Sequence, residues 1–300
     1  FPGRSIIHRQ TVIIFHSGMK KSNAICWFPA YGKYGIRVTT ISHSQDFIHW
    51  SEPVETLRGR GYENQIYSMP VFKTHGLYLG LASLIHEGDR NEKNFDCVDC
   101  ELTWSADGKK FDFAAMDQAV IPRGDGHYPD GEFDNSCIYA SSPVTDGQKV
   151  WILLHGWKWT AYKFPESSLG RAYWEADKFA CWTEKNEGME SILTTTTLTL
   201  GGNYIEVLAD EADAEKDWEL MASVHPVWTE NAYEGLGMED AVTEKSGRWI
   251  RISWKGKKLP DKSGCIRFQF KNLKIWAVRG ELEYKGHRLW EGADMENEGM

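Results

Sequence analysis

Short apolar runs separated by turn-forming residues fill the first two-thirds of the chain, and apolar residues at helical spacing are almost absent. Residues 66–71 and 77–82 form one pair of runs divided by a Thr-His-Gly turn. Residues 138–144 and 150–155 form a second pair divided by an Asp-Gly turn. Runs of this length bounded by Gly and Asp are typical of β-strands in hairpins. The pattern therefore predicts an all-β protein.

A short polar pattern recurs after some of these runs. It reads Ser-x-Asp-x-x-x-aromatic at residues 44–50 and again at 105–111, and residues 175–182 carry a looser third copy. The Ser and Asp side chains can accept hydrogen bonds from the amides of a tight turn, and we expect the aromatic ring to pack between sheets. Each copy is predicted to join the third and fourth strands of a four-stranded unit.

Repetition of such units predicts a β-propeller-like domain over residues 1–187, in which each unit is one blade. Two blades are expected at about residues 62–118 and 134–186. A less complete blade is expected at residues 24–50, preceded by one more apolar strand at residues 11–15.

The repetition stops after about residue 187, where we predict a β-sandwich-like domain over residues 188–300. The acidic stretch at residues 210–219 is expected to be a loop or a single turn. Strands are expected at residues 194–200, at 204–208 after a turn at Gly201-Gly202, and at 249–254, 265–270 and 273–278.

The charge balance argues against two classes of partner. The formal net charge is −9 and no dense stripe of Lys and Arg is present, so we expect no nucleic-acid partner. No apolar run approaches the roughly 20 residues that cross a bilayer, so no membrane span is expected. The opening Phe1-Pro-Gly-Arg4 suits a mature end left by signal-peptide removal, which predicts secretion. The oligomeric state is left open.

The six cysteines are compatible with disulfides in an oxidising compartment. Cys97 and Cys100 form a C-x-x-C pattern, but it lies in a predicted strand and no second pair follows at zinc spacing, so no metal is expected. The sequence contains no P-loop, no dinucleotide-binding glycine pattern in a βαβ setting and no Gly-x-Ser-x-Gly motif, so no cofactor is expected.

The most specific stretch of the sequence runs from Ile121-Pro-Arg-Gly124 through Gly131-Glu-Phe-Asp134 to Ser142-Pro-Val144. With the segments at 44–50, 66–81 and 101–108, it makes residues 24–186 resemble the five-bladed β-propeller glycoside hydrolases, the superfamily that holds families 32 and 43. Residues 197–202 and 265–276 look like the β-sandwich appended to many of these propellers. About three blades are readable, so the early blades are expected to be absent.

This resemblance implies a carbohydrate ligand and a pair of carboxylates that face each other across a funnel. Glu63 and Asp134 fall at matching places, each a few residues before an Ile-Tyr pair, and would serve as acid and base or as acid and nucleophile. A turn-capping role for Asp134 stays open as the alternative.

Asp99 and Glu101 flank Cys100 on a predicted strand, so both side chains are expected on one face. Carboxylates cost free energy if they are buried without a partner. They are therefore expected either to meet substrate in the funnel or to pair with Arg, and a solvated strand edge is the alternative.

Two histidines occupy matching positions at the ends of consecutive second strands. His86 and His155 are expected at one rim, where they would bind hydroxyl groups or transfer a proton, and a structural role for each is the alternative. Arg123, Trp157 and Trp159 are expected to complete the pocket, with the Trp rings as stacking platforms.

Three functions follow from these features. The first is hydrolysis of glycosides, and the second is glycan binding by an inactive propeller. The third is an enzyme that acts on a planar small molecule, such as a secreted oxidative or luciferase-type protein. It is favoured by 14 Trp, 12 Tyr and 13 Phe, which suit an aromatic pocket in which the two histidines act as an acid–base pair.

Overall fold

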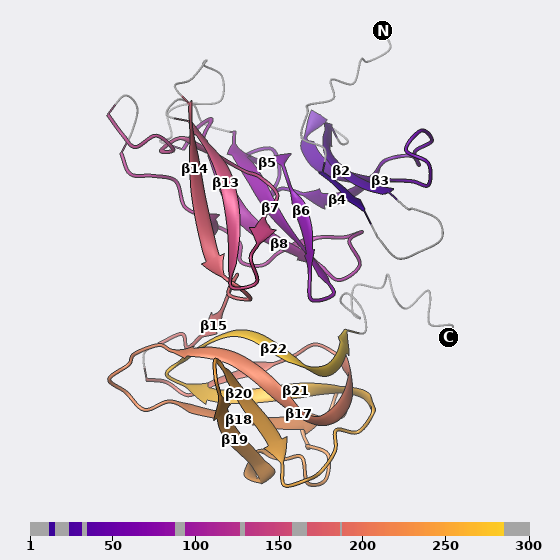
Figure 1. Cartoon of the computed structure of the whole chain (residues 1–300), viewed down its shortest axis with the longest axis vertical. Coiled ribbons are helices and arrows are strands. Elements are labelled where there is room, and N and C mark those ends of the chain that lie inside the picture. The colour runs from indigo at the N-terminus through magenta and orange to yellow at the C-terminus, as the bar shows by residue number, and fades with distance from the viewer. Residues whose placement is uncertain are drawn as a thin grey trace. The chain divides into compact units, whose positions relative to one another are not determined.

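The computed structural model describes residues 12–15, 24–31, 35–87, 94–126, 130–157, 167–186 and 188–284. The chain separates into two compact units, Phe1–Ala176 and Asp177–Met300. Nearly all regular structure of the described residues is β-strand, so the all-β prediction is confirmed (Figure 1). The domain boundary predicted after residue 187 falls a little beyond this division and stays a prediction. Among the described residues, no helix is long and apolar enough to cross a membrane.

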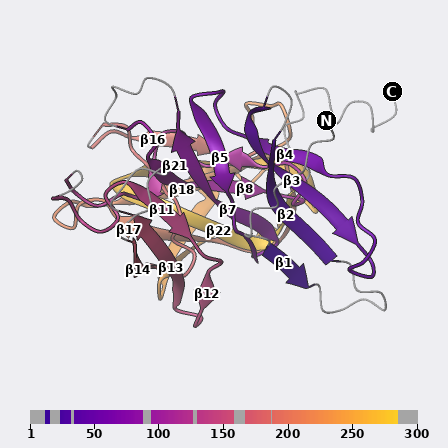
Figure 2. The same cartoon turned by 90° about the horizontal axis from the view of Figure 1, so that it is seen from above.

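The first unit opens with a four-stranded antiparallel sheet whose strands pair in chain order. Its strands are β1 (Val12–Phe15), β2 (Ala24–Tyr31), β3 (Arg37–Ser44) and β4 (Val54–Arg58). Figures 1 and 2 both show β2, β3 and β4 side by side. This early unit has the four strands of a whole blade, and is therefore more complete than the sequence pattern indicated.

The strands expected in the blade at residues 62–118 are present, but they belong to one ten-stranded sheet, which β11 (Cys137–Ala140) joins to them by pairing with β8. Within this group β7 lies at the centre, with β5 and β6 on one edge and β8 on the other, and β9 pairs with the far end of β8. The bounds are β5 (Asn64–Ser68), β6 (Val71–Thr74), β7 (Leu77–His86), β8 (Val98–Ser105) and β9 (Asp112–Phe113). β10 (Ala119–Ile121) pairs with the near half of β8.

The third group of strands departs from the prediction for residues 134–186. β11 (Cys137–Ala140) and β12 (Val144–Thr145) pair with β13 (Lys149–Trp157), which pairs with β14 (Ser167–Glu175). The strand expected to follow β14 in this blade is β15 (Trp182–Thr183), and it pairs with a strand of the second unit instead. The predicted third turn therefore does not join two strands of one blade.

Prolines interrupt the first strand of both later blades at matching places. Pro70 lies between β5 and β6, and Pro143 lies between β11 and β12. Proline has no N–H to donate to the sheet, so the strand breaks there and resumes along the same neighbour. The carbonyl of Pro70 still accepts a hydrogen bond from the Leu81 amide at 3.0 Å, which keeps the two pieces in register.

The repeated Ser-x-Asp turns form as predicted. Ser44 Oγ accepts the amide of Phe47 at 2.8 Å and Asp46 Oδ1 accepts the amide of His49 at 2.7 Å. Ser105 and Asp107 repeat these contacts in the turn between β8 and β9. The expectation for the aromatic residue holds at Phe111, which is 4% exposed, and is wrong at Trp50, which is 38% exposed. Thr145 and Asp146 form a similar turn at the Asp-Gly position predicted between residues 144 and 150.

The core of the first unit lies between its first sheet and β7. Ile41 and Leu57 from the first sheet pack with Ile66, Leu84 and Phe111. The residues of β7 are buried from Tyr78 to Ile85, so both faces of this strand are covered. A fully covered central strand fixes the positions of β8 and of the side chains that β8 carries.

The second unit is a sandwich-like pair of sheets that share the long strand β17 (Leu198–Glu211). The turn predicted at Gly201-Gly202 is wrong, because β17 continues through the glycines with a register shift against β22 between Gly201 and Ile205. Gly202 has a φ of +82°, which a residue with a Cβ rarely adopts. The chain is thus a partial propeller-like unit with a sandwich-like unit.

The other strands of the second unit differ from prediction in two ways. The strand expected at residues 194–200 is divided, and two strands were not expected, β18 and β19. The bounds are β16 (Ser191–Thr194), β18 (Glu219–His225), β19 (Ala241–Ser246), β20 (Trp249–Trp254), β21 (Lys262–Lys271) and β22 (Leu273–Tyr284). The fully buried Trp254 lies in the core between the sheets and donates Nε1 to the carbonyl of Ala222 at 3.1 Å.

Candidate functional site

A cleft of about 530 Å³ in the first unit gathers most of the charged side chains that the sequence singled out. Its lining comes from the loop after β4, the ends of β7 and β8, and the loops on either side of β10. The polar residues of the lining are Arg60, His86, Asn94, Asp99, Glu101, Asp117, Arg123, Asp125 and Asn135.

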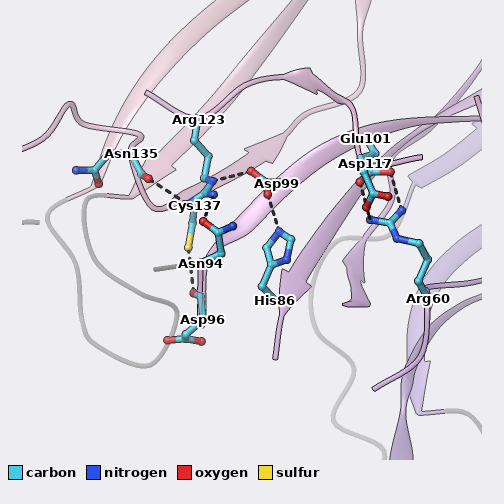
Figure 3. Close-up of polar contacts among 10 residues, drawn as sticks. All are labelled: Arg60, His86, Asn94, Asp96, Asp99, Glu101, Asp117, Arg123, Asn135 and Cys137. Carbon is cyan, nitrogen blue, oxygen red and sulfur yellow. Dashed lines mark hydrogen bonds and ion pairs between the residues drawn. The ribbon is translucent and has the colours of Figure 1, made fainter. Parts of the chain in front are cut away.

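Strand β8 places two carboxylates in the cleft. Asp99 and Glu101 are alternate residues of this strand, so their side chains point to one face, as predicted, while Cys100 between them is buried. Alternate residues of a strand lie roughly 6–7 Å apart, which is close enough for one ligand to meet both. Each carboxylate is held by its own guanidinium group (Figure 3).

Asp99 lies between His86 and Arg123. His86 Nε2 is 2.5 Å from one carboxylate oxygen, and Arg123 Nε donates to the other at 2.6 Å. Burial opposes ionisation of Asp99, but the hydrogen bond from His86 and the charge of Arg123 outweigh it and hold the pKa of this carboxyl below its usual value. An ionised carboxylate only accepts, so His86 carries its proton on Nε2.

The β7–β8 hairpin explains why His86 meets Asp99. The two strands are antiparallel neighbours, and Leu84 is the register partner of Asp99. The amide of His86 donates to the carbonyl of Cys97 at 2.9 Å, which extends the pairing to the end of the strand. The side chains of His86 and Asp99 therefore meet at the open end of the hairpin.

Glu101 is bound to Arg60 by two parallel hydrogen bonds of 2.9 and 3.0 Å. Its side chain is only 4% exposed, whereas the second partner of Arg60, Asp117, is 81% exposed and lies 2.9 Å away. The hydrogen bonds that Arg60 donates to Glu101 raise the pKa of Arg60, whose guanidinium also lies over the Phe113 ring. Both oxygens of Glu101 therefore take part in an ion pair with Arg60 at one side of the cleft.

Arg123 connects three segments on the other side of the cleft. Besides Asp99, it donates to Asn94 Oδ1 at 2.9 Å and to the carbonyl of Asn135 at 3.5 Å. Asn135 is 4% exposed, and its Nδ2 has no hydrogen-bond partner within the described part of the chain. A buried amide without a partner costs free energy.

Asp134 lies against the same segment as Arg123. A Cβ on Gly124 would lie 2.2 Å from Asp134 Oδ1 and 2.6 Å from Glu132 Oε2, so only glycine fits beneath these two carboxyls. Burial and the negative charge of Glu132 raise the pKa of Asp134. The carboxyls of Asp99 and Asp134 thus both lie against the Arg123–Gly124 segment, with pKa values shifted in opposite directions.

Asp134 lies beside Gly124 but is not among the residues that line the cleft, and the remaining predicted site residues are not brought into it either. Glu63 is exposed just before β5, and its carbonyl accepts the Glu87 amide at 2.8 Å. His155 is an exposed residue of β13 and is not part of the lining that contains His86. Trp157 ends β13 opposite Cys137, but its side chain is outside the described residues, as is Trp159.

The cysteines near the cleft are buried thiols. Burial is the largest cause of the raised pKa values of Cys97, Cys100 and Cys137, which keeps these groups protonated and unreactive. Within the ranges that the structure describes, no three His, Cys, Asp or Glu side chains are grouped as metal ligands.

Five polar residues of the cleft were not predicted from the sequence: Arg60, Asn94, Asp117, Asp125 and Asn135. All five lie outside strands. No periodic pattern marks a loop residue, so their convergence on β8 has no local signal. The only signal for Arg60 was the expectation that Asp99 and Glu101 pair with Arg, because such pairs require guanidinium groups from elsewhere in the chain.

No protein-family model matches this sequence, and no curated protein is significantly similar to it. Among solved structures, a β-fructofuranosidase from Schwanniomyces occidentalis complexed with fructosyl-erythritol is 9% identical, with a TM-score of 0.27 over 93% of this chain and 97% of that one. A fructofuranosidase variant from the same organism, complexed with fructosylnystose, is 8% identical, with a TM-score of 0.19 over 87% and 93% of the two chains. Similarity at this level assigns neither a family nor a substrate.

Proposed function

We propose that this protein is a glycoside-hydrolase-like protein that binds carbohydrate in the cleft and cleaves a glycosidic bond there with Asp99 and Asp134. The observation that carries the proposal is the placement of two carboxyls at one segment, Asp99 bound to Arg123 at 2.6 Å and Asp134 against Gly124, with pKa values lowered for Asp99 and raised for Asp134. Glycoside cleavage needs one carboxyl that holds its proton and one that is ionised.

The two carboxyls have distinct roles in this proposal. Asp134 donates a proton to the departing sugar oxygen, since its pKa is raised by burial and by Glu132. Asp99 is ionised and acts as the base or nucleophile, while Arg123 and His86 fix its orientation. Asp99 takes the role that was predicted for Glu63, so variants of both residues are compared.

The chemistry of the lining supports carbohydrate over a planar apolar ligand. The described lining residues include no Trp, Tyr or Phe, and most carry charged or amide groups. Sugar hydroxyls satisfy such groups by hydrogen bonds, whereas an apolar ring would leave them desolvated and unpaired. Secretion remains a prediction from the sequence.

Carbohydrate binding without cleavage is the second candidate, and one observation favours it. Both oxygens of Asp99 are already engaged, one by His86 and one by Arg123. A hydrogen bond on each oxygen lowers the electron density available for attack, so an Asp99 that keeps both contacts would position a sugar without attacking it.

The test measures hydrolysis of a panel of aryl glycosides and oligosaccharides together with binding by calorimetry. We expect Asp99→Asn and Asp134→Asn to lower turnover by about 100-fold or more, because each removes an acid–base group. Glu63→Gln and the surface control Glu52→Gln should leave turnover unchanged. Binding without turnover would select the second candidate, and neither binding nor turnover of any sugar would refute the proposal.

A further inference from the structure

The side chain of His86 presents a second nitrogen to the cleft besides the one that meets Asp99. Its Nε2 is 2.5 Å from Asp99, and its Nδ1 makes no hydrogen bond within the described part of the chain. Nδ1 is not one of the buried polar atoms that lack a partner, so this nitrogen is accessible. Because His86 lines the cleft and its side chain is 21% exposed, a ligand or a water molecule can reach Nδ1.

The hydrogen bond to Asp99 decides which nitrogen of His86 carries the proton. An ionised carboxylate only accepts, so the neutral imidazole has its hydrogen on Nε2 and a lone pair on Nδ1. Figure 3 shows this second ring nitrogen on the side of the ring away from Asp99. A histidine held through its far nitrogen by an aspartate is a common arrangement for a general base, because the carboxylate fixes the tautomer and stabilises the imidazolium that forms.

Both members of this pair are held in place by other parts of the chain. Asp99 lies in β8, and its second oxygen accepts from Arg123 Nε at 2.6 Å. The amide of His86 donates to the carbonyl of Cys97 at 2.9 Å, and the carbonyl of His86 accepts from the Asp96 amide at 2.7 Å. The imidazole is therefore fixed at its backbone and at its ring, which lowers the cost of reaching a reactive geometry.

We propose that His86 Nδ1 is the general base that activates a water molecule in the cleft, and that Asp99 acts through His86. The water oxygen attacks the anomeric carbon and gives one proton to Nδ1, while the bond from that carbon to the departing oxygen breaks. The departing oxygen takes a proton from Asp134, and the imidazolium pairs with the Asp99 carboxylate until it loses its proton to solvent. This inference rests on the proposed cleavage of a glycosidic bond and moves the role of base from Asp99 to His86.

The variant His86→Gln separates a base from a positioning residue. The Gln amide can still donate to Asp99, but it has no basic lone pair. Dinitrophenyl glycosides need no acid for their leaving group, so their turnover reports the base. With them, we expect His86→Gln to lower kcat by about 100-fold or more with little change in KM. His155→Gln, an exposed histidine outside the lining, should leave kcat unchanged. Wild-type kcat in His86→Gln would show that His86 only orients Asp99 and would overturn the inference.

The anomer that forms first gives a second measurement. Displacement by water activated at His86 inverts the anomeric carbon, whereas attack by Asp99 through a covalent intermediate retains its configuration, and proton NMR of the early product distinguishes the two. Retention would overturn the inference while leaving glycoside cleavage in place. Nitrogen NMR of the free protein should show the hydrogen of neutral His86 on Nε2, and a hydrogen on Nδ1 would overturn the inference whether or not a sugar is cleaved. No turnover of any glycoside would overturn both proposals.

Discussion

Arg60 offers a direct comparison between a buried and an exposed carboxylate on one guanidinium group. It pairs with Glu101, whose side chain is 4% exposed, and with Asp117, whose side chain is 81% exposed. The distances are nearly equal, 2.9 Å to each carboxylate. Glu101 makes two hydrogen bonds with Arg60 and Asp117 makes one contact, so the Glu101→Gln and Asp117→Asn variants compare a buried two-bond ion pair with an exposed single one.

Breaking a buried ion pair by removing one partner costs about 3–5 kcal/mol, whereas an exposed pair contributes about 0–1 kcal/mol. Glu101→Gln loses two charge-assisted hydrogen bonds, but Arg60 is 21% exposed and keeps Asp117. We therefore expect the lower end of the buried range, about 3 kcal/mol of unfolding free energy. Asp117→Asn should cost less than about 1 kcal/mol.

The assay is hydrogen exchange of the β7–β8 amides at increasing urea, since exchange reports the stability of the first unit separately from the second. A further variant tests the cause. Arg60→Met leaves the Glu101 carboxylate buried without its partner, so the double variant Arg60→Met/Glu101→Leu should be more stable than Arg60→Met alone. Equal costs for Glu101→Gln and Asp117→Asn, or a double variant less stable than Arg60→Met, would refute the reasoning.

Three further predictions concern other residues. The pKa of Asp99 is lowered in the folded protein, so the ionised carboxylate stabilises the fold at neutral pH and this contribution is lost in acid. In melting experiments, the difference in unfolding free energy between wild type and Asp99→Asn should therefore shrink below about pH 4. Gly170→Ala places a Cβ 2.8 Å from the Phe133 ring, and should cost about 1–3 kcal/mol in urea unfolding, a loss that Phe133→Leu relieves in the double variant. Trp254→Ala should destabilise the second unit by about 3–5 kcal/mol without changing exchange in β7 and β8, since Trp254 is fully buried between the sheets of that unit.

Local features of the sequence determined the strands and turns of the first unit. The Ser-x-Asp turns form because each side chain reaches an amide only two or three residues away, and no other part of the chain is needed. Pro70 breaks a strand for an equally local reason, the missing N–H. The shared face of Asp99 and Glu101 follows from the two-residue period of a strand.

Only the tertiary structure decided which partners those elements take. The sequence pattern predicted a strand near Trp182, but its pairing with β22 depends on a segment far along the chain. Gly201-Gly202 reads as a turn, yet β22 hydrogen-bonds on both sides of it and keeps β17 continuous. A pattern of apolar residues encodes a period and a face, and it does not encode the strand that will lie alongside.

The candidate site divides in the same way. Asp99 and His86 meet because they close one hairpin, which the sequence alone could place. Arg60, Arg123 and Asn135 come from loops whose paths depend on the packed strands beneath them, so no spacing in the sequence reveals that they converge. The sequence shows that Asp99 and Asp134 are carboxyl groups. The opposite shifts of their pKa values come from burial and from neighbouring charges, which exist only once the chain has folded.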